Sequence, residues 1–289
     1  MRKPMKWYAQ TYVGVIMSFF YLPIAVLIFF SFNQSKSRAY FTGFTLDWYR
    51  KLFTNEQIIS SLMNTLLVAI VSSVIAAIIG TAAAIGLSKV NKHLKTVVMN
   101  FTYLPIINPE IVTGVSMMLL FVSFQALFAR VQESGGVAIP FEFGYTTLIL
   151  AHITFNIPYV ILNVMPKLRQ MDNSAYEAAR DLGCDGWQAF YKVVFPDILP
   201  GIIAGFLTAI TMSMDDFIIS YFVSGPTSQT LPITIFSMMR RKVSPEANAL
   251  SAIIFVVVFA VLILVNINDA RKEKQMRQMR RRGGGSKLA

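Results

Sequence analysis

Six apolar blocks of about 20 residues or more dominate the sequence and are separated by shorter polar stretches. An α-helix needs about 20 apolar residues to cross the hydrocarbon core of a bilayer. A transmembrane β-barrel would show alternating runs of about ten residues instead. We therefore expect an all-α, polytopic membrane protein with six transmembrane helices. The predicted spans cover residues 11–31, 62–87, 97–124, 146–164, 198–222 and 249–267.

The composition agrees with a membrane protein. Hydrophobic residues make up 55% of the chain and charged residues only 14%, whereas soluble domains carry about 25% charged residues. This excludes a soluble globular enzyme, a disordered protein and a disulfide scaffold. The single cysteine, Cys184, cannot form an internal disulfide, and His93 and His152 lie far apart in the sequence. We expect no metal site and no catalytic set of residues.

Lysine and arginine are distributed unevenly between alternate loops. With the N-terminus inside the cell, the inside segments hold 18 of these residues and the outside segments hold 8. Basic residues collect in the cytoplasmic loops of membrane proteins. The split therefore predicts that both termini are cytoplasmic (N-in, C-in). The same bias explains the net charge of +11, so we expect contact with membrane lipid and no nucleic-acid partner.

The chain is expected to form a single transmembrane domain over residues 1–270, followed by a basic cytoplasmic tail over residues 271–289. The end of that tail, residues 283–289, has the composition of a linker or tag remnant. The first apolar block follows basic residues as a signal peptide does, but its length and the absence of a small-residue cleavage site favour a retained span. The aromatic loop at residues 32–60 fits either an interfacial belt or a surface for a partner.

The polar segment between the fourth and fifth blocks, residues 167–197, predicts two short helices on the inner face of the membrane. Asp172, Asn173 or Ser174 can cap the first helix. Gly183 is expected to end it in a left-handed turn, which glycine adopts freely. The second helix is predicted to be amphipathic and to stop at Pro196. Its expected apolar side carries Trp187, Phe190, Tyr191 and Val194.

The same segment contains a motif with fixed spacing: Glu177-Ala178-Ala179 is followed after three residues by Gly183 and after nine more by Val193-x-Phe195-Pro196. This motif resembles the EAA loop of permeases from binding-protein-dependent ABC importers. The family pattern has Ile and Leu where this chain has Val193 and Phe195. The resemblance implies a type I (MetI-like) importer fold with a cytoplasmic coupling helix. The residues implied in contact with a separate ATPase are Glu177, Ala178, Ala179, Asp181 and Gly183.

Four further segments resemble the spermidine/putrescine permeases of that family: residues 152–159, 213–216, 222–226 and 243–249. The likeness covers nearly the whole chain. It implies a polyamine cargo and a bacterial inner-membrane location. It also implies a second homologous permease forming a heterodimer, two ATPase subunits and an extracytoplasmic polyamine-binding protein. The sequence has no Gly-rich nucleotide-binding loop, so we expect no cofactor in this chain, with ATP and Mg²⁺ used by the ATPase.

Acidic residues inside apolar blocks suggest a pathway for a cation. Asp215 and Asp216 lie in the fifth block and Glu110 in the third, where a carboxylate costs about 2.5–3.5 kcal/mol near the bilayer centre. Tyr221 and Phe222 offer aromatic surface near the pair, because ammonium groups also bind aromatic faces. A helix end at which the acidic pair is simply hydrated remains an alternative. The basic side chain nearest to the pair is expected to be His152.

Sequence position also predicts how these helices break and pack. Pro109 is expected to interrupt the third span between Asn108 and Glu110. Gly201 and Gly205 form a small-xxx-small pair, which we interpret as close packing within the chain. On a continuous fifth helix, Asp216 would lie about 100° around the axis from Asp215. Asp216→Asn is then expected to impair transport at least as much as Asp215→Asn.

Three functions remain to be distinguished. The first is an ABC importer permease, for polyamines or for another small cargo. The second is a self-sufficient secondary transporter, which would usually show internal repeats and more spans. The third is an intramembrane enzyme, for which the sequence offers no catalytic set.

Overall fold

The computed structural model describes residues 7–35, 40–135, 137, 141–241, 245–256, 259 and 263. It divides the chain into two compact units, one formed by residues 1–56 and 238–289 and the other by residues 57–237. Within the described residues the structure is helical, with one isolated bridge between Asn33 and Phe44. Five helical segments are long and apolar enough to cross a membrane: Thr11–Ser31, Glu56–Lys89, Glu110–Glu133, Tyr145–Gln170 and Gly186–Asp215.

The first unit contains α1 (Trp7–Ser31), α2 (Asp47–Thr54) and an apolar helix at Pro245–Val256. The predicted span at 249–267 therefore starts earlier, and most of its second half lies outside the described residues. Asn33 organises the loop after α1, because its carbonyl accepts the Trp48 indole N–H at 2.8 Å and its Oδ1 accepts the Thr42 amide at 3.0 Å. Of the aromatic residues in this loop, Trp48 is buried, whereas Tyr40 and Phe44 are exposed.

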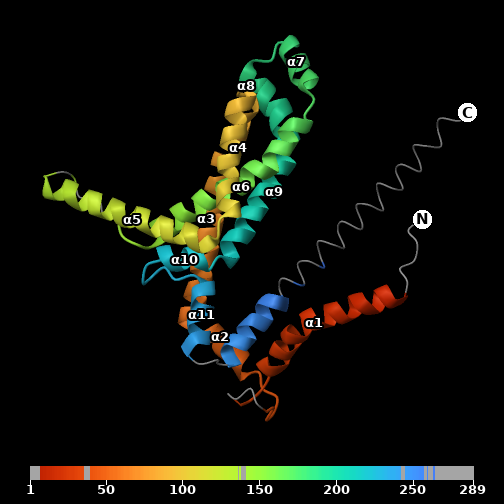
Figure 1. The fold of residues 1–289 in the computed structure, drawn as a ribbon, viewed down its shortest axis with the longest axis vertical. Helices are drawn as coiled ribbons and strands as arrows, with labels where there is room; N and C mark the ends of the chain where they lie inside the picture. Colours follow the sequence, from red (N-terminus) through yellow and green to blue (C-terminus); the bar gives the residue numbers. More distant parts are fainter. Residues whose placement is uncertain are drawn as a thin grey trace, which may run out of the picture. The chain divides into compact units, whose positions relative to one another are not determined.

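The second unit is a bundle that begins with α3 (Glu56–Lys89), α4 (Lys92–Ile107), α5 (Glu110–Glu133) and α6 (Tyr145–Gln170). The bundle continues through α7 (Asn173–Asp181), α8 (Gly186–Ala189), the π-helical turn η1 (Phe190–Val194), α9 (Phe195–Asp215) and α10 (Ile218–Val223). It ends within α11 (Leu231–Arg241), of which residues 231–237 belong to this unit. The helices α4, α6 and α9 run side by side, while α5 leaves this group at an angle (Figure 1). This unit carries both candidate sites.

Small residues let α6 and α9 approach closely. A Cβ atom on Gly201 would lie 2.9 Å from the carbonyl oxygen of Asn163, and one on Gly205 would lie 3.1 Å from the Cα of Val160. From the other side, a Cβ on Gly80 of α3 would lie 2.7 Å from the Val160 side chain. The interpretation of the glycine pair as packing within the chain is thus confirmed.

Two apolar clusters fill the bundle. The larger joins α3, α4, α6 and α9 through buried residues that include Ala84, Val164 and Ile198. The smaller joins α3, α5, α6 and α10 through residues that include Val68 and Phe121. The second cluster holds α10 against α5, where Phe222 packs over Gly114. These contacts fix the helix ends that line the cavity described below.

The structure confirms one predicted helix break and corrects two predicted helix boundaries. The third block forms two helices rather than one, and the break at Asn108 and Pro109 confirms the predicted interruption. The fifth span does not extend to residue 222, because α9 ends at Asp215 and α10 begins at Ile218. Pro196 does not stop the chain's helical path. It occupies the first turn of α9, directly after the π-helical turn.

Candidate functional site

A cavity of about 130 Å³ lies where several helix ends meet. The end of α4 and the start of α5 border it on one side, and the end of α9 and the start of α10 border it on another. The helix α6 contributes the remaining wall. The residues that line the cavity are Pro105, Glu110, Thr113, Phe155, Tyr159, Met212, Asp215, Asp216 and Ile219.

Two breaks in the helices place the acidic residues in this cavity. Pro109 ends the path of α4 and allows α5 to start at Glu110. At the other break, Asp216 has φ −62° and ψ 120°, which is an extended conformation that terminates α9. The sequence separates Glu110 from Asp215 by 105 positions, yet both line the same cavity. The structure thus brings together the three acidic residues that the sequence singled out.

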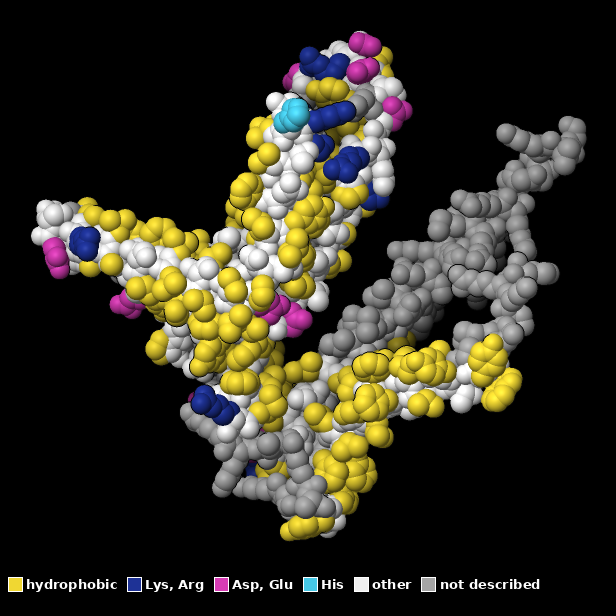
Figure 2. Space-filling view, viewed as in Figure 1, with side chains coloured by type: hydrophobic (Ala, Val, Ile, Leu, Met, Phe, Trp, Pro, Cys, Tyr) yellow, Lys and Arg dark blue, Asp and Glu magenta, His cyan; other side chains and the backbone are white. Residues whose placement is uncertain are grey.

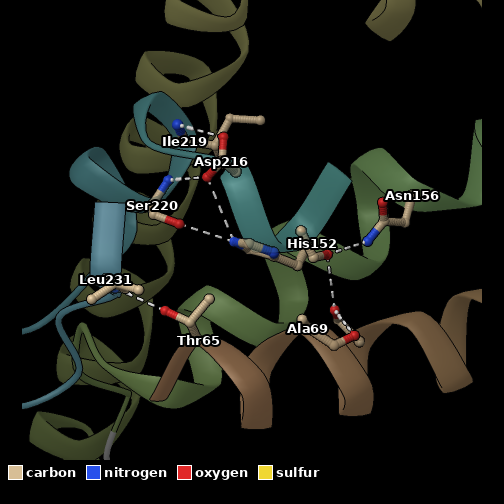
Figure 3. Close-up of polar contacts among 10 residues, drawn as sticks. Thr65, Ala69, His152, Asn156, Asp216, Ile219, Ser220 and Leu231 are labelled. Carbon is tan, nitrogen blue, oxygen red and sulfur yellow. Dashed lines mark hydrogen bonds and ion pairs between the residues drawn. The ribbon is translucent and has the colours of Figure 1, made fainter. Parts of the chain in front are cut away.

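Asp216 does not sit on a continuous helix but caps the next one. Its Oδ2 accepts the amide N–H of Ser220 at 2.7 Å, and its Oδ1 accepts that of Ile219 at 3.3 Å (Figure 3). The first amides of a helix lack partners within the helix, and a carboxylate satisfies them well. Asp216 is 9% exposed, whereas Asp215 is an exposed residue. The alternative of a hydrated helix end therefore fits Asp215, which ends α9 and is exposed, but not Asp216, which is buried.

His152 of α6 approaches the same carboxylate. Its Nε2 lies 3.6 Å from Oδ2 of Asp216 and 3.1 Å from Oγ of Ser220 (Figure 3). The His152 side chain is completely buried. The expectation that His152 is the basic side chain nearest to the pair agrees with this geometry. These non-covalent contacts connect α6 to the break between α9 and α10.

Further buried hydrogen bonds extend from this region toward α3. The Asn156 amide donates to Ser213 Oγ at 2.7 Å, and Ser213 Oγ lies 3.4 Å from Ser72 Oγ. All three side chains are buried. Buried polar groups are costly unless they are paired, so these bonds fix the register of α3, α6 and α9 beside the cavity.

The aromatic wall comes from a different helix than the sequence indicated. Tyr221 is 50% exposed, and Phe222 packs against Gly114. Neither is among the residues that line the cavity; Phe155 and Tyr159 of α6 are. Their spacing of four residues places both on one helical face. This spacing was readable in the sequence, but only the fold shows that the face meets the acidic residues.

The second candidate site is the segment from Asp172 to Val194. Asp172 caps α7 by accepting the Ser174 amide at 2.9 Å. The hydrogen bonds from Ser174 hold the pKa of the Asp172 carboxyl below its ordinary value. At the other end, Gly183 has φ +90°, and the amide of Cys184 bonds to the carbonyl of Ala179 at 3.1 Å. Of the three candidate capping residues, Asp172 is the one that caps α7, and the predicted left-handed turn at Gly183 is confirmed.

This segment is well exposed. Charged side chains gather around α7 and α8 at one end of the second unit, while hydrophobic side chains cover much of the helices below (Figure 2). Glu177, Ala178, Asp181 and Gly183 are exposed, and Ala179 is half-buried. The neighbouring side chains of Leu182, Trp187 and Tyr191 are 87%, 74% and 62% exposed.

The expected apolar side of the second short helix is divided between surface and core. Val194 is buried and Phe190 packs against the larger apolar cluster, whereas Trp187 and Tyr191 face outward. The reason is the π-helical turn, which changes the angular spacing of side chains on which the prediction depended.

Among the described residues, no group of three His, Cys, Asp or Glu side chains is arranged to hold a metal ion. Acids and aromatic rings at the cavity favour a cationic ligand with apolar parts. The exposed apolar side chains beside α7 are suited to contact with another protein.

Comparison with known proteins identifies the class of protein. Residues 73–274 match the family described as "Binding-protein-dependent transport system inner membrane component". The chain belongs to this family and is a permease of the ABC importer type, not an enzyme.

Two curated relatives illustrate the likeness. The putrescine transport system permease protein PotI of Escherichia coli (strain K12) is 36% identical over 261 residues, covering 89% of each chain. The spermidine/putrescine transport system permease protein PotC of Haemophilus influenzae is 32% identical over 255 residues, covering 88% of this chain and 93% of that one.

Solved structures show the same fold. A chain of a bacterial alginate ABC transporter, in complex with an alginate pentasaccharide-bound periplasmic protein, has a TM-score of 0.69. It is 18% identical, and the match covers 92% of this chain and 93% of that one. The fold of an ABC importer permease is therefore shared well beyond the range of close sequence similarity.

Proposed function

We propose that this chain is one permease subunit of an ATP-driven importer for polyamines such as putrescine and spermidine. The observation that carries the proposal is the cavity lined by Glu110, Asp215 and Asp216 together with Phe155 and Tyr159. No lysine or arginine is among its lining residues. The names of the relatives, putrescine and spermidine/putrescine permeases, support the same cargo.

The chemistry of a polyamine fits this lining. Its ammonium groups pair with carboxylates and also bind the faces of aromatic rings. Its methylene segments can lie against Phe155, Met212 and Ile219. An entirely carboxylate-lined site would hold a polycation too firmly for release, whereas a mixed lining lets the cargo pass. Glu110 and Asp215 are the acids best placed for such passage, because both are exposed.

The proposed topology has six spans with both termini in the cytoplasm of a bacterial cell, in the inner membrane. The 18-to-8 division of Lys and Arg between alternate segments supports this orientation. The helix at Pro245–Val256 would begin the sixth span. In this arrangement the segment 167–197 faces the cytoplasm and residues 32–60 face the outside.

The proposed partners are a second homologous permease, two ATPase subunits and an extracytoplasmic polyamine-binding protein. The family description names binding-protein dependence. ATP and Mg²⁺ would be used by the ATPase and not by this chain. The ATPase contact would comprise Glu177, Ala178, Ala179, Asp181 and Gly183, with Trp187 adding exposed apolar surface.

Uptake by the whole transporter tests the function. Vesicles that contain the complex and its binding protein should accumulate labelled putrescine or spermidine only when ATP is supplied. Double substitution of Glu110→Gln and Asp215→Asn should reduce uptake at unchanged permease level. Uptake of neither polyamine by an assembled complex that still hydrolyses ATP would indicate a different cargo. Transport by the permease alone would indicate a secondary transporter.

A further inference from the structure

The three acidic residues of the cavity are not equivalent. Both carboxylate oxygens of Asp216 accept backbone hydrogen bonds, and the side chain is buried. Among the described residues, the carboxylate of Asp215 is hydrogen-bonded only to its own backbone amide, and that of Glu110 has no hydrogen-bond or ion-pair partner. An acid that already accepts two amides has less capacity to bind a passing ammonium group than an acid with free oxygens.

We propose that Asp216, Ser220 and His152 are positioning residues, which hold the break between α9 and α10 so that Asp215 stays at the cavity wall. This proposal takes the identity of the cargo, a polyamine, from the proposed function. The contacts that hold the break do not depend on which cargo is transported. Asp215 and Glu110 then remain as the acids that contact the cargo.

The short helix α10 needs such support. It has six residues, fewer than an isolated helix requires. Asp216 satisfies two amides at its start, while Val223 and Ile219 anchor it in the smaller apolar cluster. No proline or glycine lies between Asp215 and Ile218 to enforce the break. The capping bonds are therefore what favours a break over a continuous helix at this point.

His152 supports the capping carboxylate from α6. A carboxylate oxygen 3.6 Å from Nε2 favours the tautomer with its proton on that nitrogen. We assign the proton to Nε2 for this reason. The Nδ1 atom is then an acceptor, and it has no hydrogen-bond partner among the described residues. The other tautomer, with its proton on Nδ1, would cost more. It would leave the Nδ1–H donor unpaired and would place the lone pair of Nε2 opposite the carboxylate of Asp216.

Hydrogen exchange of the purified whole transporter in lipid nanodiscs gives a direct test. The amides of Ile219 and Ser220 report the capping bonds. His152→Ala and Asp216→Asn should each accelerate exchange in residues 217–224 several-fold and lower polyamine uptake. His152→Gln, which keeps a donor near the Nε2 position, should restore much of both. His93→Ala, at an exposed histidine of α4, is the matched control and should change neither.

Asp215→Asn separates positioning from cargo contact. It should lower uptake while leaving exchange in residues 217–224 unchanged. Ser220→Ala provides a milder positioning variant, with Ser123→Ala on α5 as its control, since Ser123 is exposed and bonds only within its own helix. Equal exchange in the His152→Ala and unmutated proteins would overturn the positioning role. Because exchange does not depend on cargo, that result would be distinct from a failure to transport polyamines.

Discussion

The cavity and the loop of residues 172–194 are held together by different kinds of contact. Around the cavity, residues far apart in sequence bind one another, as His152 and Ser220 do across 68 positions. In the loop the bonds are local: Asp172 to Ser174, Asp185 to Gln188 and Cys184 to Ala179. Damage to the cavity should therefore affect the whole bundle, whereas damage to the loop should affect what binds there.

The largest effect is expected at a glycine of the packed region. Gly201→Val would force a side chain toward Asn163, where even a Cβ atom would lie 2.9 Å from the carbonyl oxygen. Overpacking of this kind costs about 1–3 kcal/mol or more. The ratio of folded to unfolded protein should fall about fivefold or more, and the yield of folded complex should fall with it. Gly86→Val on α3, where nothing lies within 4 Å of an added Cβ, is the control. Equal yields of the two variants after detergent extraction would contradict the packing argument.

Gly183→Val tests the loop of residues 172–194, the other region in the comparison. Valine disfavours the left-handed conformation by about 1–2 kcal/mol, and φ at this position is +90°. The bundle should stay folded, while the ATPase retained on the purified complex, or the uptake per ATP hydrolysed, falls by about tenfold. The matched control is Gly186→Val, because Gly186 has no positive φ and an added Cβ there has no contact under 3.8 Å. Unchanged ATPase retention with unchanged uptake would contradict the coupling role.

Asp215→Asn should lower polyamine uptake several-fold at matched permease level and unchanged ATPase retention. The reason is loss of a negative charge at the cavity wall, on a carboxylate that does not cap a helix. This reverses the order that a continuous fifth helix suggested, in which Asp216 was expected to matter at least as much through cargo contact. Asp197→Asn, at an exposed acid near the other end of α9, should transport normally. Similar uptake by both variants would exclude Asp215 from the pathway.

A smaller effect is expected from the aromatic wall. Tyr159→Leu removes a ring that lines the cavity, and a cation–π contact contributes about 0.5–2 kcal/mol. Uptake should fall a few-fold. Tyr221→Leu removes a half-exposed ring outside the cavity lining and should have little effect. If Tyr221→Leu lowers uptake more than Tyr159→Leu, the aromatic contribution lies on α10 rather than α6.

The smallest effect is expected at the cap of α7. The lowered pKa of Asp172 means that its carboxylate stabilises the helix at neutral pH, and that this contribution is lost as the pH falls through that pKa. Asp172→Ala should accelerate hydrogen exchange in residues 174–176 at pH 7, while Asp172→Asn, which keeps an acceptor, should do so less. The difference between Asp172→Ala and the unmutated protein should shrink in strongly acidic solution. A difference that is constant with pH would show that the carboxylate does not act as the cap.

The loop was largely predictable because its signals are local. A capping side chain at Asp172 and a glycine at 183 specify a helix start and a helix end without reference to the rest of the chain. The break at Pro109 was predictable for the same reason. The prediction failed at Pro196, because the chain stays helical through the π-helical turn and the proline falls in the first turn of α9.

The cavity was only partly predictable. Carboxylates in apolar blocks are conspicuous by their cost, so Glu110, Asp215 and Asp216 could be identified. The break after Asp215 could not, since Phe217 and Ile218 continue an apolar pattern and the capping bonds to Asp216 are visible only in three dimensions. The lining role of Phe155 and Tyr159 depends on which face of α6 meets α9, which is determined by the glycines that α9 presents to it.

The helical path from Gly186 to Asp215, which includes the π-helical turn at Phe190–Val194, has a mechanical consequence. Thirty residues of helix form a rod about 45 Å long, with exposed Trp187 near one end and Asp215 at the other. A tilt of about 5° at the Trp187 end would displace the Asp215 end by about 4 Å at that length. In the proposed importer, a push on the surface loop would therefore move Asp215 at the cavity if α9 tilts as a rigid body.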